Sequence, residues 1–270
     1  MKKQQQIRKK LIIFTALAGA LILTAIFADI LAPMDPYEQN LLLAQQAPGP
    51  THWLGCDRYG RDLLSRVIAG SKTSILASLL LVAVTASAGT LIGVLSGWFQ
   101  GKTDVICMRL ADLFLAFPGL VVAMAIAGVL GGGLNNAFLA LAVVGWPKYA
   151  RLARSLTMSQ KDAPYIMASR LAGSGTGKIL IHHILPNIAG QLLVTAVLDI
   201  GTMMMELAGL SFLGLGVKPP AAEWGSMMND GRSMLQIAPW MVLAPGLAIF
   251  ISVVIFNLLG DILRDYLDPK

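Results

Sequence analysis

Three side chains able to bind a cation fall on one face of a long apolar segment. Asp199, Met203 and Glu206 are spaced i, i+4 and i+7, which places them on the same side of an α-helix. Asp199 lies near the middle of the segment, where a charge costs about 2.5 to 3.5 kcal/mol if the segment spans a membrane. Two interpretations stay open. The three residues could line a pore on a cation route, or Asp199 could be hydrogen-bonded to a neighbouring helix at a subunit interface.

No other motif predicts catalysis or nucleotide binding. The stretch from Gly173 to Lys178 is glycine-rich, but a phosphate-binding loop has the pattern G-x4-G-K-[ST] and follows a strand. Counting back from Gly177, the first glycine position holds Ala172, and Ile179 replaces the Ser or Thr. The sequence contains no Ser/His/Asp or H-E-x-x-H arrangement. We therefore expect no enzymatic activity and no cofactor in this chain.

The histidines and cysteines do not form a predicted metal site. His182 and His183 are adjacent, so on a helix they point about 100° apart and are expected to be solvated. His52 and Cys56 are interpreted as a surface or turn pair, because two ligands do not make a metal site. Cys107 is distant from Cys56 in the sequence, and no disulfide between them is expected.

The elements that would position these residues are predicted to be membrane-spanning helices. Of the 270 residues, 56% are hydrophobic and 13% are charged, whereas a soluble domain has about 25% charged residues. We predict an all-α polytopic membrane protein with six transmembrane helices, each long enough to cross a bilayer. The expected spans are 11–32, 74–98, 104–130, 137–156, 188–212 and 240–263, of which the last five form a core, 74–263.

Particular residues indicate how these spans begin, pack and bend. The run 11–32 follows a basic head and is too long for the apolar region of a secretory signal, so we expect an uncleaved first span. Gly89, Gly93 and Gly97 form a ridge of small residues that lets another helix approach closely. Pro118 is expected to kink the third span.

Basic residues are expected to set the topology rather than to bind nucleic acid. The net charge is +6, and 15 of the 21 Lys and Arg residues lie on the side of the predicted termini. Because basic residues favour the cytoplasm, the head 1–10, the tail 264–270 and the loop 157–187 are predicted to be cytoplasmic. The loop 33–73 is predicted to lie outside, so Cys56 is expected to react with a thiol reagent added there.

A polar, basic stretch between two apolar runs, 162–187, is predicted to form a helix-turn-helix finger. Residues 165–172 are expected to be helical, and a run of glycines beginning at Gly173 then breaks the helix. A second short helix, 178–184, is expected to stop before Pro186. A finger of this kind between two spans is suited to docking in a groove of a soluble partner.

The finger also carries a resemblance to a known family, the ABC importer permeases. Their cytoplasmic loop has the pattern E-A-A-x3-G-x9-I-x-L-P, which resembles Met167-Ala168-Ser169, Gly173 and His183-Ile184-Leu185-Pro186 here. The Glu, the third residue and the first Ile of the pattern are replaced. Residues 52–66 resemble the signature HWLGTD-x-x-GRD-x-x-SR of the peptide and nickel branch, with Cys56 in place of Thr, and 208–216 and 256–269 resemble two further stretches of that branch.

The resemblance is to the second permease subunit of dipeptide, oligopeptide and nickel importers. It implies the type I ABC importer permease fold and a complex in the bacterial inner membrane. The implied partners are a second permease subunit, two ATPase subunits that bind ATP-Mg, and an extracytoplasmic substrate-binding protein. The finger would be the coupling helix, which sits in a cleft of an ATPase. Its coupling residues would be Met167, Ala168, Ser169, Gly173, Leu185 and Pro186.

Within this branch, the residues 198–204, 222–225 and 227–230 look most like the nickel permease. The resemblance therefore implies nickel import, with the metal travelling as a chelate. A di- or oligopeptide, or an opine-type metallophore, carried by the same machinery is the alternative. A stand-alone secondary transporter needs paired broken helices in inverted repeats. The sequence shows no such repeat, and that interpretation would leave the finger unexplained.

Overall fold

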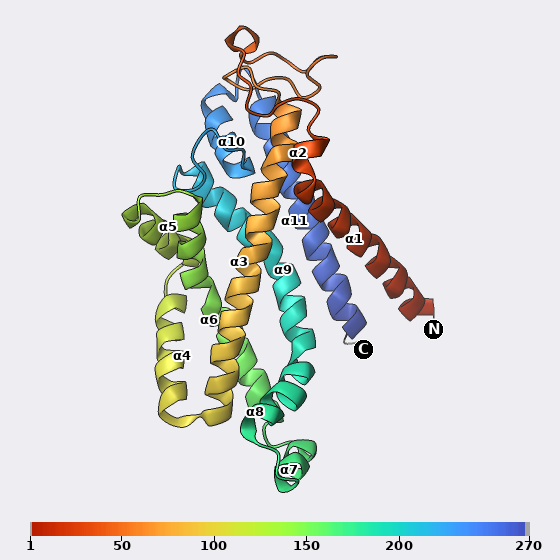
Figure 1. Cartoon of the computed structure of the whole chain (residues 1–270), viewed down its shortest axis with the longest axis vertical. Helices are drawn as coiled ribbons and strands as arrows, with labels where there is room; N and C mark the ends of the chain where they lie inside the picture. The colour runs from red at the N-terminus through yellow and green to blue at the C-terminus, as the bar shows by residue number, and fades with distance from the viewer. Residues whose placement is uncertain (1, 268–270) are drawn as a thin grey trace.

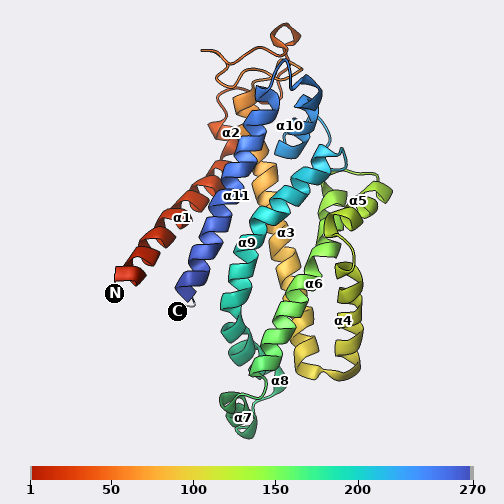
Figure 2. The ribbon, with the colours of Figure 1, turned by 180° about the vertical axis from the view of Figure 1, so that it is seen from behind.

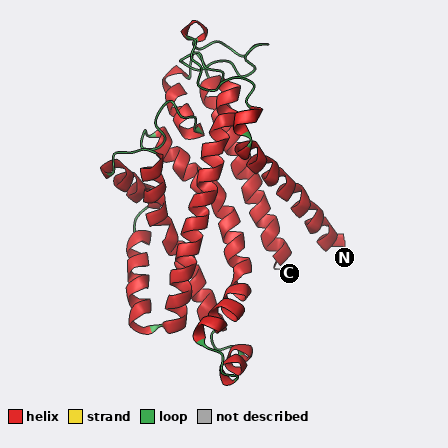
Figure 3. Ribbon diagram, in the orientation of Figure 1, coloured by secondary structure: helices red, strands yellow, loops and turns green. Residues whose placement is uncertain are grey.

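The computed structural model describes residues 2–267, and no β-strand occurs among them, so the all-α prediction is confirmed (Figure 3). The body of the molecule consists of α1 (Lys2–Ile26), α3 (Leu63–Phe99), α4 (Gly101–Leu115), α5 (Gly119–Val129), α6 (Leu134–Gln160), α9 (Leu185–Phe212) and α11 (Trp240–Leu267). The connections contain α2 (Ala28–Leu31), α7 (Pro164–Leu171), α8 (Thr176–Ile179), α10 (Trp224–Gly231), the 3₁₀ turns η1 (Leu41–Leu43) and η3 (Arg232–Met234), and the π-helical turn η2 (Leu180–Ile184).

The long helices run up and down between two ends of the molecule. The turn between α3 and α4 lies near one end and α7 lies at its tip, and the start of α1 and the end of α11 point toward the same end but stop short of it (Figures 1 and 2). The opposite end carries the long connection between α2 and α3 together with α10 (Figures 1 and 2). The predicted grouping of the termini with the loop 157–187 therefore agrees with the path of the chain.

Hydropathy and length support fewer spans than the six predicted. Four helical segments are long and apolar enough to cross a membrane, and the pair of α4 and α5 is a fifth if it counts as one span. The helix α6 has 27 residues but carries Lys148, Arg151 and Arg154 in its second half. These charges lower its hydropathy, although it runs alongside the other helices (Figure 1).

The predicted third span consists of two helices instead of one kinked helix. The axes of α4 and α5 are bent by 89° at the break between them, and Pro118 occupies the N-cap position of α5. Proline has no amide N–H and disfavours helical geometry at the preceding residue, here Phe117. The sequence located the kink at Pro118 correctly, but the kink is a break between two helices, which form one span if the bent pair is counted together.

Two predicted boundaries near the N-terminus also need correction. The helix α3 begins at Leu63 instead of residue 74, because the Asp62 carboxylate accepts a hydrogen bond from the Ser65 amide at 2.8 Å and caps the helix. The last part of the predicted loop 33–73, residues 63–73, is therefore helical. The basic head is helical as well, since α1 extends from Lys2.

The predicted ridge of small residues packs α3 against α6. A Cβ atom added to Gly89, Gly93 or Gly97 would lie 2.4, 2.3 or 2.8 Å, respectively, from a backbone carbonyl oxygen of α6. Only hydrogen fits in that space, so the close approach expected from the three glycines is confirmed. This contact lies in the middle of the fold and fixes the helix that carries Lys148.

The second helix of the finger does not end at Pro186 as predicted. From α8 the chain continues through the π-helical turn η2 into α9, and Thr176–Phe212 forms one helical segment. Pro186 lies in the first turn of α9, and the wider turn before it accommodates a residue that has no amide hydrogen to donate. The finger is therefore joined rigidly to the helix that carries Asp199.

Candidate functional site

The finger, made of α7, the following turn and α8, projects beyond the ends of α3 and α6 (Figure 1). On its inner side Ile166 belongs to one apolar cluster with Ile179 and Ile184. On its outer side Met167 is exposed, and Leu171 is 90% exposed. Apolar side chains held out on a short, well-packed support are suited to insertion into a partner protein.

Polar contacts anchor the base of the finger to the end of α3. The guanidinium carbon of Arg170 lies 4.7 Å from the centroid of the Trp98 ring, a cation–π contact. The Lys161 ammonium donates a hydrogen bond to the Trp98 carbonyl oxygen at 2.7 Å. The Ser169 hydroxyl and the His183 ring are hydrogen-bonded at 3.3 Å. The finger is therefore linked to α3. The far end of α3 carries the segment 32–62, which we call the outer loop after its predicted side of the membrane.

The turn of the finger depends on Gly173, which has a φ of +78°. Side chains rarely adopt this conformation, so the predicted turn geometry at Gly173 is confirmed. Met167, Ala168, Gly173 and Pro186 are exposed, whereas Ser169 and Leu185 are half-buried. Their role in coupling stays a prediction.

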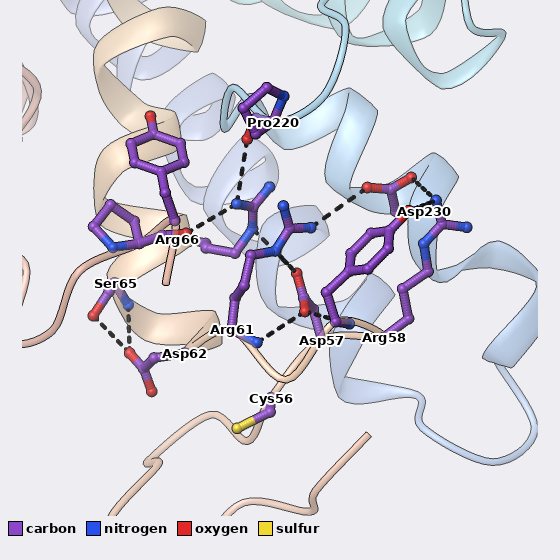
Figure 4. Close-up of polar contacts among 12 residues, drawn as sticks. Cys56, Asp57, Arg58, Arg61, Asp62, Ser65, Arg66, Pro220 and Asp230 are labelled. Carbon is purple, nitrogen blue, oxygen red and sulfur yellow. Dashed lines mark hydrogen bonds and ion pairs between the residues drawn. The ribbon is translucent and has the colours of Figure 1, made fainter. Parts of the chain in front are cut away.

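At the opposite end, a buried ionic cluster fixes the outer loop (Figure 4). The Asp57 carboxylate is paired with Arg61 at 2.6 Å and with Arg66 at 3.4 Å. Its other oxygen accepts hydrogen bonds from the backbone amides of Tyr59 and Arg61 at 2.8 and 3.0 Å. The Arg61 and Arg66 side chains are 2% and 3% exposed. These pairs offset the charge of basic residues on the side opposite the predicted termini, where few of the Lys and Arg residues lie.

A single residue of α10 connects that helix to the cluster. Asp230 pairs with Arg58 at 3.2 Å and lies 3.9 Å from Arg61. Arg66 also donates a hydrogen bond to the Pro36 carbonyl oxygen at 3.0 Å. The cluster therefore joins the loop, the start of α3 and α10. Sequence reasoning missed Asp230 as a partner of the loop, because its distance along the chain gives no signal of the contact.

His52 and Cys56 are buried and therefore do not form a surface pair, but they flank a turn in which the Gly55 amide donates a hydrogen bond to the His52 carbonyl oxygen at 2.9 Å. The His52 ring is hydrogen-bonded to the Asp62 carboxylate at 2.9 Å, and the Cys56 side chain is inaccessible to solvent. Burial, together with the nearby Asp62 and Asp57 carboxylates, raises the pKa of the Cys56 thiol to about 11. The two residues stabilise the loop that precedes α3.

Within the helical bundle, Asp199 is 5% exposed and has partners on α6. It is paired with the Lys148 ammonium, and it accepts a hydrogen bond from the Tyr149 hydroxyl at 2.9 Å. Sequence reasoning missed both partners, although a lysine in a predicted span was a usable signal. Met203 is buried, and Glu206 is half-buried beside a cavity. That these residues line a pore stays a prediction.

No group of three or more His, Cys, Asp or Glu side chains within residues 2–267 is arranged to hold a metal ion. The two cysteines are both free thiols.

The fold and the finger together define a class of protein: a helical membrane permease domain with a short helical projection at one end. Residues 89–270 match the family model described as the binding-protein-dependent transport system inner membrane component. The chain belongs to this family, and the resemblance to the ABC permeases of the peptide and nickel branch is confirmed.

Similar proteins extend over the whole chain. It is 40% identical to the dipeptide transport system permease protein DppC of Alkalihalophilus pseudofirmus, with 99% of this chain and 88% of the relative covered. It is 41% identical to the nickel transport system permease protein NikC of Escherichia coli K12, with 100% and 96% covered. It is 42% identical to the glutathione transport system permease protein GsiD of Pectobacterium atrosepticum, with 93% and 83% covered.

The fold is shared with a solved transporter. A chain of the inward-facing MetNI methionine ABC transporter matches with a TM-score of 0.59 and 18% identity, covering 74% of this chain and 96% of that chain. The likeness supports the predicted type I ABC importer permease fold.

Proposed function

We propose that this chain is the permease subunit of an ATP-driven importer and forms half of a translocation pore. A second, homologous permease subunit completes the pore. Two ATPase subunits bind ATP-Mg and hydrolyse it, and an extracytoplasmic binding protein delivers the cargo. This chain binds no cofactor and transmits movement without catalysing a reaction.

The observation that carries the proposal is the finger. It projects from one end of the bundle (Figure 1), exposes Leu171, and continues without interruption into α9. A movement imposed on the finger by an ATPase therefore reaches the middle of the membrane through one helix. In this proposal both termini and the finger are cytoplasmic, and the loop that precedes α3 lies outside.

The cargo we propose is nickel carried as a chelate, on the resemblance of 198–204, 222–225 and 227–230 to the nickel permease. A di- or oligopeptide is the second candidate. One observation favours it, since the dipeptide and glutathione permeases are as similar to this chain as the nickel permease is. An opine-type metallophore would use the same machinery.

Uptake by the complete complex tests the proposal. The two permeases, the ATPases and the binding protein are reconstituted in proteoliposomes, and entry of nickel with histidine as chelator and of a radiolabelled dipeptide is measured with and without ATP. We expect ATP-dependent entry of one of the two cargoes. If neither cargo enters in an ATP-dependent manner, the importer proposal is wrong. If one of them enters, that cargo identifies the substrate class.

A further inference from the structure

One cavity at the side of the helical bundle has two charged groups in its walls. It lies beside the break between α4 and α5, is also lined by α6 and α9, and has a volume of about 120 Å³. It is partly open, since Phe117 in its wall is 58% exposed. Phe114, Phe117 and Met203 supply much of its apolar wall. Lys148 and Glu206 are the charged residues among those that line it. Charged side chains facing a cavity within a membrane protein are characteristic of substrate or ion pathways.

The two charged groups have different surroundings. Lys148 is ion-paired with Asp199, so the two charges cancel. No hydrogen bond or ion pair of Glu206 with another side chain occurs within residues 2–267, and the charges that act on it are those of Lys148 and Asp199. Ionised Glu206 therefore leaves an excess negative charge in an apolar cavity, where a charge without a partner is costly. A positively charged group that enters the cavity would remove this cost.

The shape and composition of the cavity suit an ammonium group better than a divalent metal ion. A single available carboxylate supplies too few ligands for such an ion, which takes four to six or more. An ammonium group needs one strong acceptor and is attracted to aromatic rings, and Phe114 and Phe117 lie in the same wall. Lys148 has three N–H donors, so it can bind an anion while it remains paired with Asp199.

We propose that this cavity binds the primary ammonium group of the transported cargo. Glu206 accepts the hydrogen bonds of that group, and Lys148, held in place by Asp199, binds a carboxylate next to it. The proposal rests on the proposed importer function and narrows its cargo to molecules with an amino-acid end group. Two sources share this chemistry: a free peptide, and an amino-acid chelator of nickel that keeps an ammonium group uncoordinated.

The charge of the cavity is tested by thiol labelling in the reconstituted complex. Val144 lines the cavity, so Val144→Cys is made in a Cys107→Ser background. The labelling rate with cationic 2-aminoethyl methanethiosulfonate is divided by the rate with neutral methyl methanethiosulfonate. We expect Glu206→Gln to lower this ratio by about threefold or more, because a nearby carboxylate concentrates cations. The control Asp261→Asn, whose native side chain is 62% exposed, should leave the ratio unchanged.

Two results of the labelling experiment would overturn the ammonium site. One is an equal ratio of the cationic to the neutral labelling rate in proteins with Glu206 and with Glu206→Gln. The other is a thiol at position 144 that reacts with neither reagent, because a cavity that small reagents cannot enter does not admit a cargo.

Transport separates this proposal from the importer function and identifies the source of the ammonium group. We expect Glu206→Gln to slow uptake of dialanine, or of nickel with lysine as chelator, by about tenfold, with partial rescue by Glu206→Asp. Lysine binds the metal through its α-amino and carboxylate groups and keeps its ε-ammonium group free. Loss of dialanine uptake alone assigns the peptide, and loss of nickel uptake alone assigns the chelator. If the wild type moves neither cargo, the importer proposal fails. If Glu206→Gln moves both at the wild-type rate, only the ammonium site fails.

Discussion

The two ends of the molecule are stabilised by different forces. At the outer end, Asp57, Arg61 and Arg66 are buried and paired, and Asp230 joins them from α10 (Figure 4). At the finger, apolar packing and cation–π contact support a surface on which Leu171 is almost fully exposed. A buried ionic network tolerates little rearrangement, because separating one pair leaves a charge without a partner. The outer end is therefore built to keep one geometry, and the finger is built to receive a partner.

The largest expected effect follows from removing the charge at the centre of the ionic cluster. Asp57→Asn leaves Arg61 and Arg66 buried with less negative charge nearby, and we expect a loss of about 3 to 5 kcal/mol of stability. The melting temperature of the purified complex measures this loss. Asp29→Asn is the matched control, because Asp29 and its partner Lys72 are 69% and 48% exposed, and such surface pairs contribute at most about 1 kcal/mol. Equal melting temperatures for the two variants would remove the proposed contrast between the ends.

A second prediction concerns the buried pair that lies between the two ends. Asp199→Leu removes the acceptor of both Lys148 and Tyr149, and we expect a loss of about 1 to 3 kcal/mol that reduces assembly of the complex. Asp199→Asn keeps a hydrogen bond to Tyr149, so it should assemble, but Lys148 loses its counter-charge and then offsets the charge of Glu206, so uptake should slow several-fold. Co-purification of the partner subunits and uptake in proteoliposomes measure the two properties. Uptake at the wild-type rate by an assembled Asp199→Asn variant would show that Asp199 acts only through its hydrogen bonds.

Local spacing predicted those parts of the fold that depend on neighbouring residues. The ridge of Gly89, Gly93 and Gly97 repeats every four residues, and this repeat alone indicated a close helix contact. The apolar runs indicated the helices, and Gly173 indicated the turn of the finger. Pro118 indicated the position of the break in the third span, but the 89° bend depends on how α5 packs against α6 and cannot be obtained from the proline.

The outer loop was predicted less well, because its structure depends on contacts distant in sequence. Nothing near Arg58 in the sequence indicates that its partner is Asp230, and the charged residues Arg66 and Lys72 within 63–73 concealed the first turns of α3. The same limit applies to the cavity. Asp199 and Glu206 share a helical face, but Asp199 forms an ion pair with Lys148 of α6, whereas Glu206 does not form one.

The finger should respond to a backbone change with loss of coupling but little loss of stability. Gly173→Asp forces a side chain into a φ of +78°, which costs about 1 to 2 kcal/mol locally. We expect several-fold weaker stimulation of ATP hydrolysis by the loaded binding protein. Gly175→Asp adds the same charge at a φ of −70°, where the side chain is a favourable helix cap for α8. An equal loss in both variants would assign the effect to charge, and normal stimulation by Gly173→Asp would remove the finger turn from coupling.

The smallest effect is expected at Cys56, where the fixed geometry of the outer end should prevent any reaction. The thiol is inaccessible to solvent, and its pKa is raised to about 11. About 0.1% of the thiol is therefore ionised at pH 8, and the ionised fraction rises only as the pH approaches 11. This reverses the sequence-based expectation that Cys56 is modified from outside. A maleimide added to intact cells at pH 8 should instead label Trp53→Cys, since Trp53 is 72% exposed in the same loop.

The same labelling series tests the proposed orientation of the two ends. A cysteine introduced by Ser174→Cys, in the turn of the finger, should be protected from an impermeant maleimide until the membrane is made permeable. The reverse pattern, with the finger labelled and position 53 protected, would invert the topology. Rapid labelling of Cys56 in the folded complex would show that the outer loop opens. The ionic cluster holds that loop in place, so an outer loop that opens would mean that the cluster adds little stability and that Asp57→Asn has a small effect. The labelling of Cys56 and the melting temperature of Asp57→Asn therefore test the same rigidity.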